Sequence, residues 1–255
     1  MGMDDPSKVK IAASMGYDYI EVGFASLARG EDAEYEAFCI ALRENDIKCE
    51  AANGFLPRDY KVTGNNIDND KLSKYVEKGM ERGSKIGLKT VVFGSGGARE
   101  LEDGTDYITG FSQIADFIRN IACPIADKYG VTIVLEPLCK QECNIINTVV
   151  EGADMAAASG CKNAGSLADI YHMQMEGDVW DNIRRLKDNL IHAHISYPFM
   201  YEGKKRVYPR NVDEYDYSGF INALKDAGCE RCSIEAAVID FESDAKAAIK
   251  VLHSL

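Results

Sequence analysis

The segment VTIVLEPLCKQECNIINT, residues 131–148, joins a strongly apolar run to a carboxylate and a proline. Its first five residues are apolar or β-branched, which is typical of a strand that is buried on both faces. Pro137 restricts the preceding residue, Glu136, to an extended conformation. The segment therefore predicts a buried strand that ends by presenting the carboxylate of Glu136.

Similar apolar runs alternate with amphipathic helical patterns along the whole chain. The predicted strands cover residues 17–23, 47–53, 89–95, 131–138, 164–170, 189–196 and 231–236. The predicted helices cover residues 5–15, 33–45, 69–86, 107–129, 148–159, 175–188, 216–228 and 240–254. Several helices end at a glycine that can cap them: Gly16, Gly87, Gly130, Gly160 and Gly228. This repeated order of helix, glycine and strand is typical of a parallel sheet with helical crossovers.

The fold class indicated by this pattern is α/β, and the architecture that fits it best is a TIM-type (β/α) barrel. No linker or change of composition divides the chain, so we expect one barrel domain over residues 1–255. An eight-stranded barrel needs a strand before the helix at 5–15, and the segment MGMDD does not provide one. We therefore expect a barrel whose first strand is missing or degenerate, with a doubly wound sheet of seven strands as the alternative. The exposed edge left by a missing strand predicts a homo-oligomer or a partner subunit.

The composition indicates a small molecule as the binding partner. The chain has 29 Lys and Arg against 41 Asp and Glu, a formal net charge of −12, which opposes binding to nucleic acids and to anionic membranes. No apolar run reaches the roughly 20 residues of a membrane-spanning helix. The N-terminus is too polar and acidic for a secretory signal, so we expect a cytoplasmic protein. The eight scattered cysteines are expected to be reduced thiols, and the single CxxC at Cys229–Cys232 is interpreted as incidental.

The last four predicted strands all end in a residue of a type that binds metal ions. These residues are Glu136, Asp169, His194 and Glu235. In a TIM barrel the carboxyl ends of the strands form the active site, so we expect the four side chains to converge there. Three carboxylates and an imidazole suit a divalent ion such as Mn²⁺, Mg²⁺ or Co²⁺, and the absence of cysteine from the set disfavours zinc.

Each of these residues also has a purely structural interpretation. A single glutamate at the end of a strand is more often a solvated loop residue, and Asp169 can simply cap the following helix. His192 has the same strand parity as His194 and can be a core histidine with satisfied hydrogen bonds. Four consecutive strands with such endings favour the metal site over these separate explanations.

Several motifs together resemble those of the xylose isomerase-like TIM-barrel superfamily. They are LEPL (135–138), DIYHM (169–173), HAHIS (192–196), SIEA (233–236), NGFLP (53–57) and VFGSGGAR (92–99). The resemblance covers the chain from residue 8 onward and is strongest to the sugar phosphate isomerase/epimerase branch, which includes ketose 3-epimerases and hydroxypyruvate isomerases. It implies that one divalent metal ion is bound by Glu136, Asp169, His194 and Glu235. It also implies that Glu142 and His172 contact substrate oxygens.

The expected function is that of a metal-dependent sugar isomerase or epimerase. A metal ion that is chelated by an α-hydroxycarbonyl polarises the carbonyl group and stabilises the developing enediolate. The neighbouring proton becomes acidic enough for a nearby carboxylate to remove it. Glu136 and Glu235 are the candidate proton carriers. Return of the proton to the opposite face gives epimerisation, whereas return to the adjacent carbon gives aldose–ketose isomerisation.

The substrate-binding motifs depart from those of the family at three positions. The family often reads EPLNR where this chain has EPLCK, with Cys139 and Lys140. Ketose 3-epimerases carry an arginine six residues after the metal-binding histidine, whereas this chain has Met200. We expect Arg206, or alternatively Arg210, to replace that arginine from the segment KKRVYPR (204–210). These departures favour a bulkier or oxidised sugar, such as a keto-glycoside, over a simple ketohexose.

Three other functions are alternatives to this one. The superfamily includes endonuclease IV, but its three-zinc site needs many histidines and this acidic chain has only four. A metal-dependent lyase or dehydratase on a keto-sugar, keto-glycoside or cyclic polyol begins with the same proton abstraction and then expels a β-substituent. A non-catalytic barrel subunit is the third alternative. Product analysis separates the lyase from the isomerase, and a metal titration tests the non-catalytic alternative.

Overall fold

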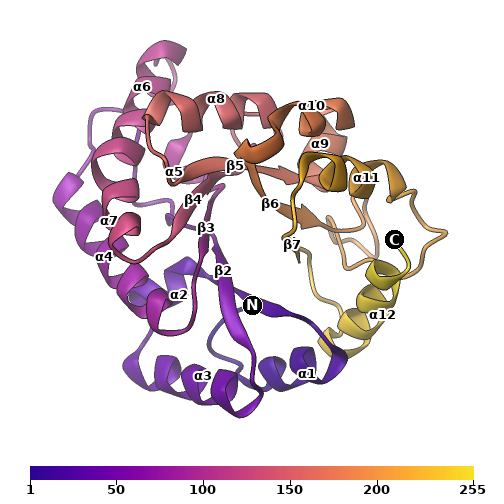
Figure 1. Ribbon diagram of the computed structural model, residues 1–255. Helices are drawn as coiled ribbons and strands as arrows, with labels where there is room; N and C mark the ends of the chain where they lie inside the picture. Colours follow the sequence, from indigo (N-terminus) through magenta and orange to yellow (C-terminus); the bar gives the residue numbers. More distant parts are fainter.

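The computed structural model describes residues 1–255 as a ring of parallel strands enclosed by helices (Figure 1). The strands are β1 (Tyr19–Gly23), β2 (Lys48–Asn53), β3 (Thr90–Phe93), β4 (Thr132–Leu135), β5 (Ala164–Asp169), β6 (Leu190–Ile195) and β7 (Cys232–Ile234). Each strand pairs in parallel with the next one in sequence. This sequential order is that of a TIM barrel, and it excludes the doubly wound alternative, in which the strand order reverses.

The helices follow the predicted pattern with a few differences. They are α1 (Ser7–Met15), α2 (Phe24–Arg29), α3 (Asp32–Glu44), α4 (Asn69–Lys85), α5 (Gly96–Arg99), α6 (Tyr107–Phe117), α7 (Cys123–Lys128), α8 (Val149–Ser159), α9 (Ile170–Glu176), α10 (Trp180–Leu186), α11 (Ser218–Ala227) and α12 (Phe241–His253). The predicted helix 175–188 is wrong, because α9 ends at Gly177 in a left-handed conformation (φ 65°) and α10 begins afresh. The predicted helix 107–129 contains a π-helical turn, Ile118–Ala122, just before Pro124, whose missing N–H interrupts the helical hydrogen bonding. The short helices α2 and α5 and most of α9 were not predicted.

The barrel is open between β1 and β7, as expected for a barrel without its first strand. These two strands do not pair with each other. The main chain of Met1 partly fills the gap, donating a hydrogen bond to the carbonyl of Glu21 and accepting one from the N–H of Gly23. The side chains of Tyr19 and Ser233 also meet across the opening, with their hydroxyl oxygens 3.0 Å apart. A groove lined mainly by apolar side chains of β1, β7 and α12 occupies the rest of the gap.

The strands are held by cores on the outside of the barrel. The larger core contains 43 buried residues and includes edge-to-face contacts of Phe55 with Phe24 and Phe93. A second core of 15 buried residues lies under α10 and α11. All eight cysteines are free thiols, as predicted. None of the helices has the length and apolar character needed to cross a membrane.

The contact between α2 and α4 requires a glycine. A Cβ atom at Gly79 would lie 2.3 Å from the ring of Phe24, which is itself fully buried. We predict that Gly79→Ala lowers the free energy of unfolding by about 1–3 kcal/mol, because overpacking outweighs the roughly 1 kcal/mol gain in helix propensity. Urea unfolding measures this, with the exposed Lys78→Ala of the same helix as the control, for which a change within about 0.5 kcal/mol is expected. A Gly79→Ala protein as stable as the wild type would contradict this packing.

Candidate metal centre

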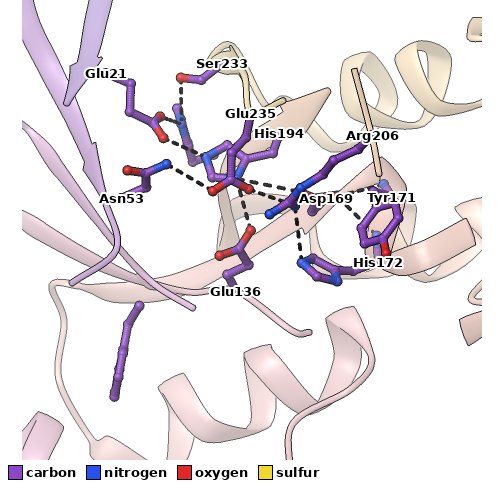
Figure 2. Close-up of polar contacts among 12 residues, drawn as sticks. Glu21, Asn53, Glu136, Asp169, Tyr171, His172, His194, Arg206, Ser233 and Glu235 are labelled. Carbon is purple, nitrogen blue, oxygen red and sulfur yellow. Dashed lines mark hydrogen bonds and ion pairs between the residues drawn. The ribbon is translucent and has the colours of Figure 1, made fainter. Parts of the chain in front are cut away.

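The four predicted strand-end residues lie together at the carboxyl ends of β4, β5, β6 and β7 (Figure 2). Asp169 is the last residue of β5, His194 is the penultimate residue of β6, and the two are register partners. Glu136 and Glu235 directly follow β4 and β7. One potential ligand atom from each of the four residues lies within 4.8 Å of every other. All four side chains are buried except that of Glu235, which is 21% exposed.

The Nδ1 atom of His194 is the centre of this group. It lies 3.0 Å from Oε1 of Glu136, 3.2 Å from Oε2 of Glu235 and 3.7 Å from Oδ2 of Asp169. A ring N–H can donate a good hydrogen bond to only one of three acceptors, so the carboxylates are not satisfied by this histidine alone. The arrangement has the donor set of a divalent cation site, with three oxygen ligands and one nitrogen ligand.

A buried oxygen without a hydrogen bond supports the same conclusion. Oε2 of Glu235 is 2.9 Å from Nη1 of Arg206 and 3.2 Å from His194 Nδ1, but neither approach has hydrogen-bond geometry. Nη1 of Arg206 also lies 3.2 Å from Oδ2 of Asp169. The guanidinium group thus places a positive charge among the carboxylates. A cation at this position is stabilising because it reduces their mutual repulsion. The residues present therefore fit a divalent ion.

Asp169 combines its predicted structural role with a place in the site. Its Oδ1 atom accepts hydrogen bonds from the backbone N–H groups of Tyr171 and His172 and so caps α9. Its Oδ2 atom faces His194 and Arg206. The helix cap fixes the carboxylate plane and directs Oδ2, which accepts a 3.2 Å hydrogen bond from Nη1 of Arg206, into the centre.

The position of Glu136 is fixed by its backbone and by a nearby glycine. Arg99 is fully buried and donates hydrogen bonds of 2.7 Å to the carbonyl oxygens of Phe93 and Glu136. This pair of bonds connects the carboxyl ends of β3 and β4. At Gly94, a Cβ atom would lie 2.1 Å from Oε2 of Glu136, so a glycine is needed for this carboxylate to occupy its place.

The two candidate proton carriers have opposite protonation tendencies. Burial, together with the charge of Glu235, raises the pKa of Glu136. Burial also disfavours ionisation of Glu235, but the positive charges of His194 and Arg206 outweigh it and lower the pKa of that carboxyl group. Two carboxyl groups with separated pKa values can act as acid and base in one reaction.

Two residues of the centre were not predicted from the sequence. Glu21 of β1 accepts a hydrogen bond from Nε2 of His194 at 3.0 Å, on the side opposite the carboxylate group. Asn53, at the end of β2, donates a hydrogen bond of 3.0 Å to Oε1 of Glu235. The sequence does contain a signal for Glu21, because its carboxylate stands between the apolar residues Ile20 and Val22. In a strand this alternation places the Glu21 side chain on the face opposite to theirs.

Two of the predicted substrate-binding residues, His172 and Arg206, lie beside this centre. His172 is buried, and its Nε2 is 3.4 Å from Nη1 of Arg206. Glu142 is farther out, with its carboxylate 3.7 Å from Nζ of Lys205 and its side chain 31% exposed. Of the two arginines considered, Arg206 reaches the centre, whereas Arg210 forms an ion pair with Glu214 at 2.7 Å.

The comparison with known families agrees with this fold. A model of the family described as xylose isomerase-like TIM barrel matches residues 9–255. The chain belongs to this family. D-psicose 3-epimerase of Agrobacterium fabrum (strain C58 / ATCC 33970) is 24% identical over 198 residues, which are 73% of this chain and 65% of that protein. The matched region therefore spans less than two thirds of this relative's length.

Two solved structures are similar to the chain over almost its whole length. The 3-keto-D-glucoside 4-epimerase of E. coli has a TM-score of 0.77 at 20% identity, covering 98% of this chain and 93% of that protein. The D-allulose 3-epimerase of Methylomonas sp. has a TM-score of 0.79 at 19% identity, covering 96% of this chain and 89% of that protein. At these identities, the similarity establishes the shared fold.

The buried Arg99 offers a test of how the site is supported. We predict that Arg99→Met lowers the free energy of unfolding by about 1–3 kcal/mol, because the buried carbonyl of Glu136 is left without a donor, whereas that of Phe93 keeps a 3.3 Å hydrogen bond from the N–H of Glu136. Urea denaturation measures this loss. Arg58→Met is the control, since the Arg58 side chain is 80% exposed, and it should change stability little. Equal stabilities of the two variants would show that Arg99 does not connect β3 and β4.

Proposed function

We propose that the protein is a divalent-metal-dependent epimerase or isomerase that acts on a ketose or a related α-hydroxycarbonyl sugar. The observation that carries this proposal is the convergence of three carboxylates on one imidazole nitrogen at the carboxyl end of the barrel. The known activities of the similar epimerases support the same reaction class. We further propose Mn²⁺, Mg²⁺ or Co²⁺ as the ion, since the oxygen-rich ligand set suits these ions better than zinc.

The residues that would hold the ion are Glu136, Asp169, His194 and Glu235. When bound, the ion supplies Lewis-acid polarisation of the substrate carbonyl. Glu136 and Glu235 approach His194 Nδ1 from β4 and from β7, which are separate strands of the barrel. One carboxylate can therefore remove a proton from the carbon next to the carbonyl while the other delivers a proton.

His172 and Arg206 are proposed to orient the substrate. Nδ1 of His172 accepts a 3.0 Å hydrogen bond from the backbone N–H of Cys139, so in the neutral ring the proton is on Nε2. That N–H faces an N–H of Arg206 at 3.4 Å. Two donors directed at the same space require an acceptor between them, and a hydroxyl or carbonyl oxygen of a sugar provides one. Glu142, at the rim, is proposed to accept from a more distant hydroxyl group.

The charges around the site favour an uncharged sugar over a sugar phosphate. A divalent ion and the guanidinium of Arg206 together balance the three carboxylates of the centre. Two cations near it, Lys205 and Lys140, pair with Glu142 and Glu176.

The central test is hydrogen exchange in D₂O with Mn²⁺ and a panel of ketoses and 3-keto-glycosides. We predict that the wild type introduces deuterium at the carbon next to the carbonyl of at least one of them. Glu136→Gln and Glu235→Gln should each exchange about 10²–10⁴-fold more slowly, since each lacks a proton carrier. NMR measures the exchange, and the exposed Glu230→Gln is the control expected to act like the wild type. The absence of exchange with every sugar would refute the proposed function.

Arg206 has a separate predicted effect. We predict that Arg206→Met raises the KM for the sugar more than tenfold, because a donor to the substrate is lost. The same variant should bind Mn²⁺ at least as tightly as the wild type, because the guanidinium group no longer competes for Asp169 and Glu235. Steady-state kinetics and calorimetry measure both values. Lys204→Met, an exposed neighbour in the same loop, serves as the control. An unchanged KM would rule out substrate binding by Arg206.

A further inference from the structure

We propose that Glu21 is a positioning residue that holds the His194 ring in its metal-binding orientation and thereby sets the affinity of the site. This inference rests on the proposed function, because it assumes that His194 binds the ion. Glu21 lies on β1, on the far side of His194 from the three carboxylates (Figure 2). It would act through His194, without contacting the ion or the substrate.

The geometry assigns the two nitrogens of His194 to different tasks. Nε2 is 3.0 Å from Oε1 of Glu21, whereas Nδ1 faces Glu136, Asp169 and Glu235. When Nε2 donates its proton to Glu21, the lone pair of a neutral ring is on Nδ1, which is the atom directed at the proposed ion. A carboxylate that accepts from the outer N–H also makes the ring a stronger ligand.

The second oxygen of Glu21 is held by another histidine. Oε2 of Glu21 is 3.0 Å from Nε2 of His192, and that nitrogen is also 3.1 Å from Oγ of Ser233. The Ser233 hydroxyl in turn meets that of Tyr19. These contacts fix the plane of the Glu21 carboxylate, and they explain why the sequence places His192 on the same face as His194.

The local shape of β1 directs Glu21 to this position. The pairing of β1 with β2 changes register between Ile20 and Glu21. Such irregularities commonly redirect a side chain near an active site. Ile20 and Val22 are buried, and their side chains point to the opposite face of the strand. A shift of β1 by one residue would therefore replace the carboxylate by an aliphatic side chain and remove the support of His194.

A second metal ion is the alternative explanation of this cluster, because ligand atoms of Glu21, His192 and His194 also lie within 4.8 Å of one another. The hydrogen bonds favour positioning over a second site. Each oxygen of Glu21 already faces one imidazole nitrogen at 3.0 Å. A second ion would require His194 to give both of its nitrogens to metals. The structure thus assigns one ion to each chain, with Glu21 behind its histidine ligand.

The test is metal binding by Glu21→Gln, measured by Co²⁺ calorimetry and by the visible absorption spectrum of the bound Co²⁺. We expect the dissociation constant to increase about 10–100-fold. The spectrum should also change, because the orientation and basicity of the His194 ligand change. Glu50→Gln is the matched control, since it removes a carboxylate from β2 that pairs with Lys89 and Arg231 away from His194. Circular dichroism establishes that each variant is folded, and its affinity is calculated for the folded fraction.

The outcomes separate the two proposals. Wild-type affinity and an unchanged Co²⁺ spectrum in Glu21→Gln would overturn the positioning role while leaving the proposed function intact. Two Co²⁺ ions per wild-type chain, with one lost in Glu21→Gln, would also overturn it, in favour of a second metal site. A wild type that binds no Co²⁺ would refute the proposed function and, with it, this inference. The positioning role is supported if Glu21→Gln binds Co²⁺ more weakly than the wild type, still at one ion per chain, while Glu50→Gln does not.

Discussion

Three carboxylate oxygens within 4 Å of a single imidazole nitrogen are the interaction on which the rest of the structure depends. Burying one unpaired carboxylate costs several kcal/mol, and neighbouring carboxylates also repel one another. The chain offsets this cost with His194 and with the guanidinium group of Arg206, whose contact with Glu235 lacks hydrogen-bond geometry. A small divalent ion at the same place would satisfy all four ligands at once, and this is the physical basis of the proposed chemistry.

Much of the surrounding structure holds these groups at their positions. Arg99 joins the ends of β3 and β4, Gly94 leaves room for the carboxylate of Glu136, and the cap of α9 orients Asp169. These supports lie directly beside the ligands, at the ends of β3 and β4 and at the start of α9. The open side of the barrel also contributes, since Glu21 comes from β1 at the edge of the sheet and reaches the far side of His194. In this way the incomplete barrel holds His194 between Glu21 on one side and the three carboxylates on the other.

The sequence predicted the barrel and the convergence of its four strand ends because both follow from local patterns. Apolar runs define strands, and parallel strands bring their carboxyl ends together. The same criterion, an ionisable residue at a strand end, does not include Asn53, whose side chain is a neutral amide. It missed Glu21 because that residue lies within a strand and its role depends on a partner 173 positions away.

Other features depended on tertiary structure that no local pattern contains. The conformation of the loop decides which of the two arginines reaches the metal centre. Arg206, which has a positive φ of 31°, reaches it, whereas Arg210 forms an ion pair with Glu214. The break between α9 and α10 follows from the left-handed conformation of Gly177, which the periodicity of the apolar residues did not reveal. The roles of the site residues in binding and catalysis remain predictions from their chemistry.

Anomalous diffraction from crystals soaked in Mn²⁺ tests the central claim most directly. The account predicts one anomalous peak per chain at coordination distance from Glu136, Asp169, Glu235 and Nδ1 of His194, with the guanidinium group of Arg206 moved away from the carboxylates. The absence of a peak there, with Arg206 still inserted between Asp169 and Glu235 at saturating Mn²⁺, would contradict it.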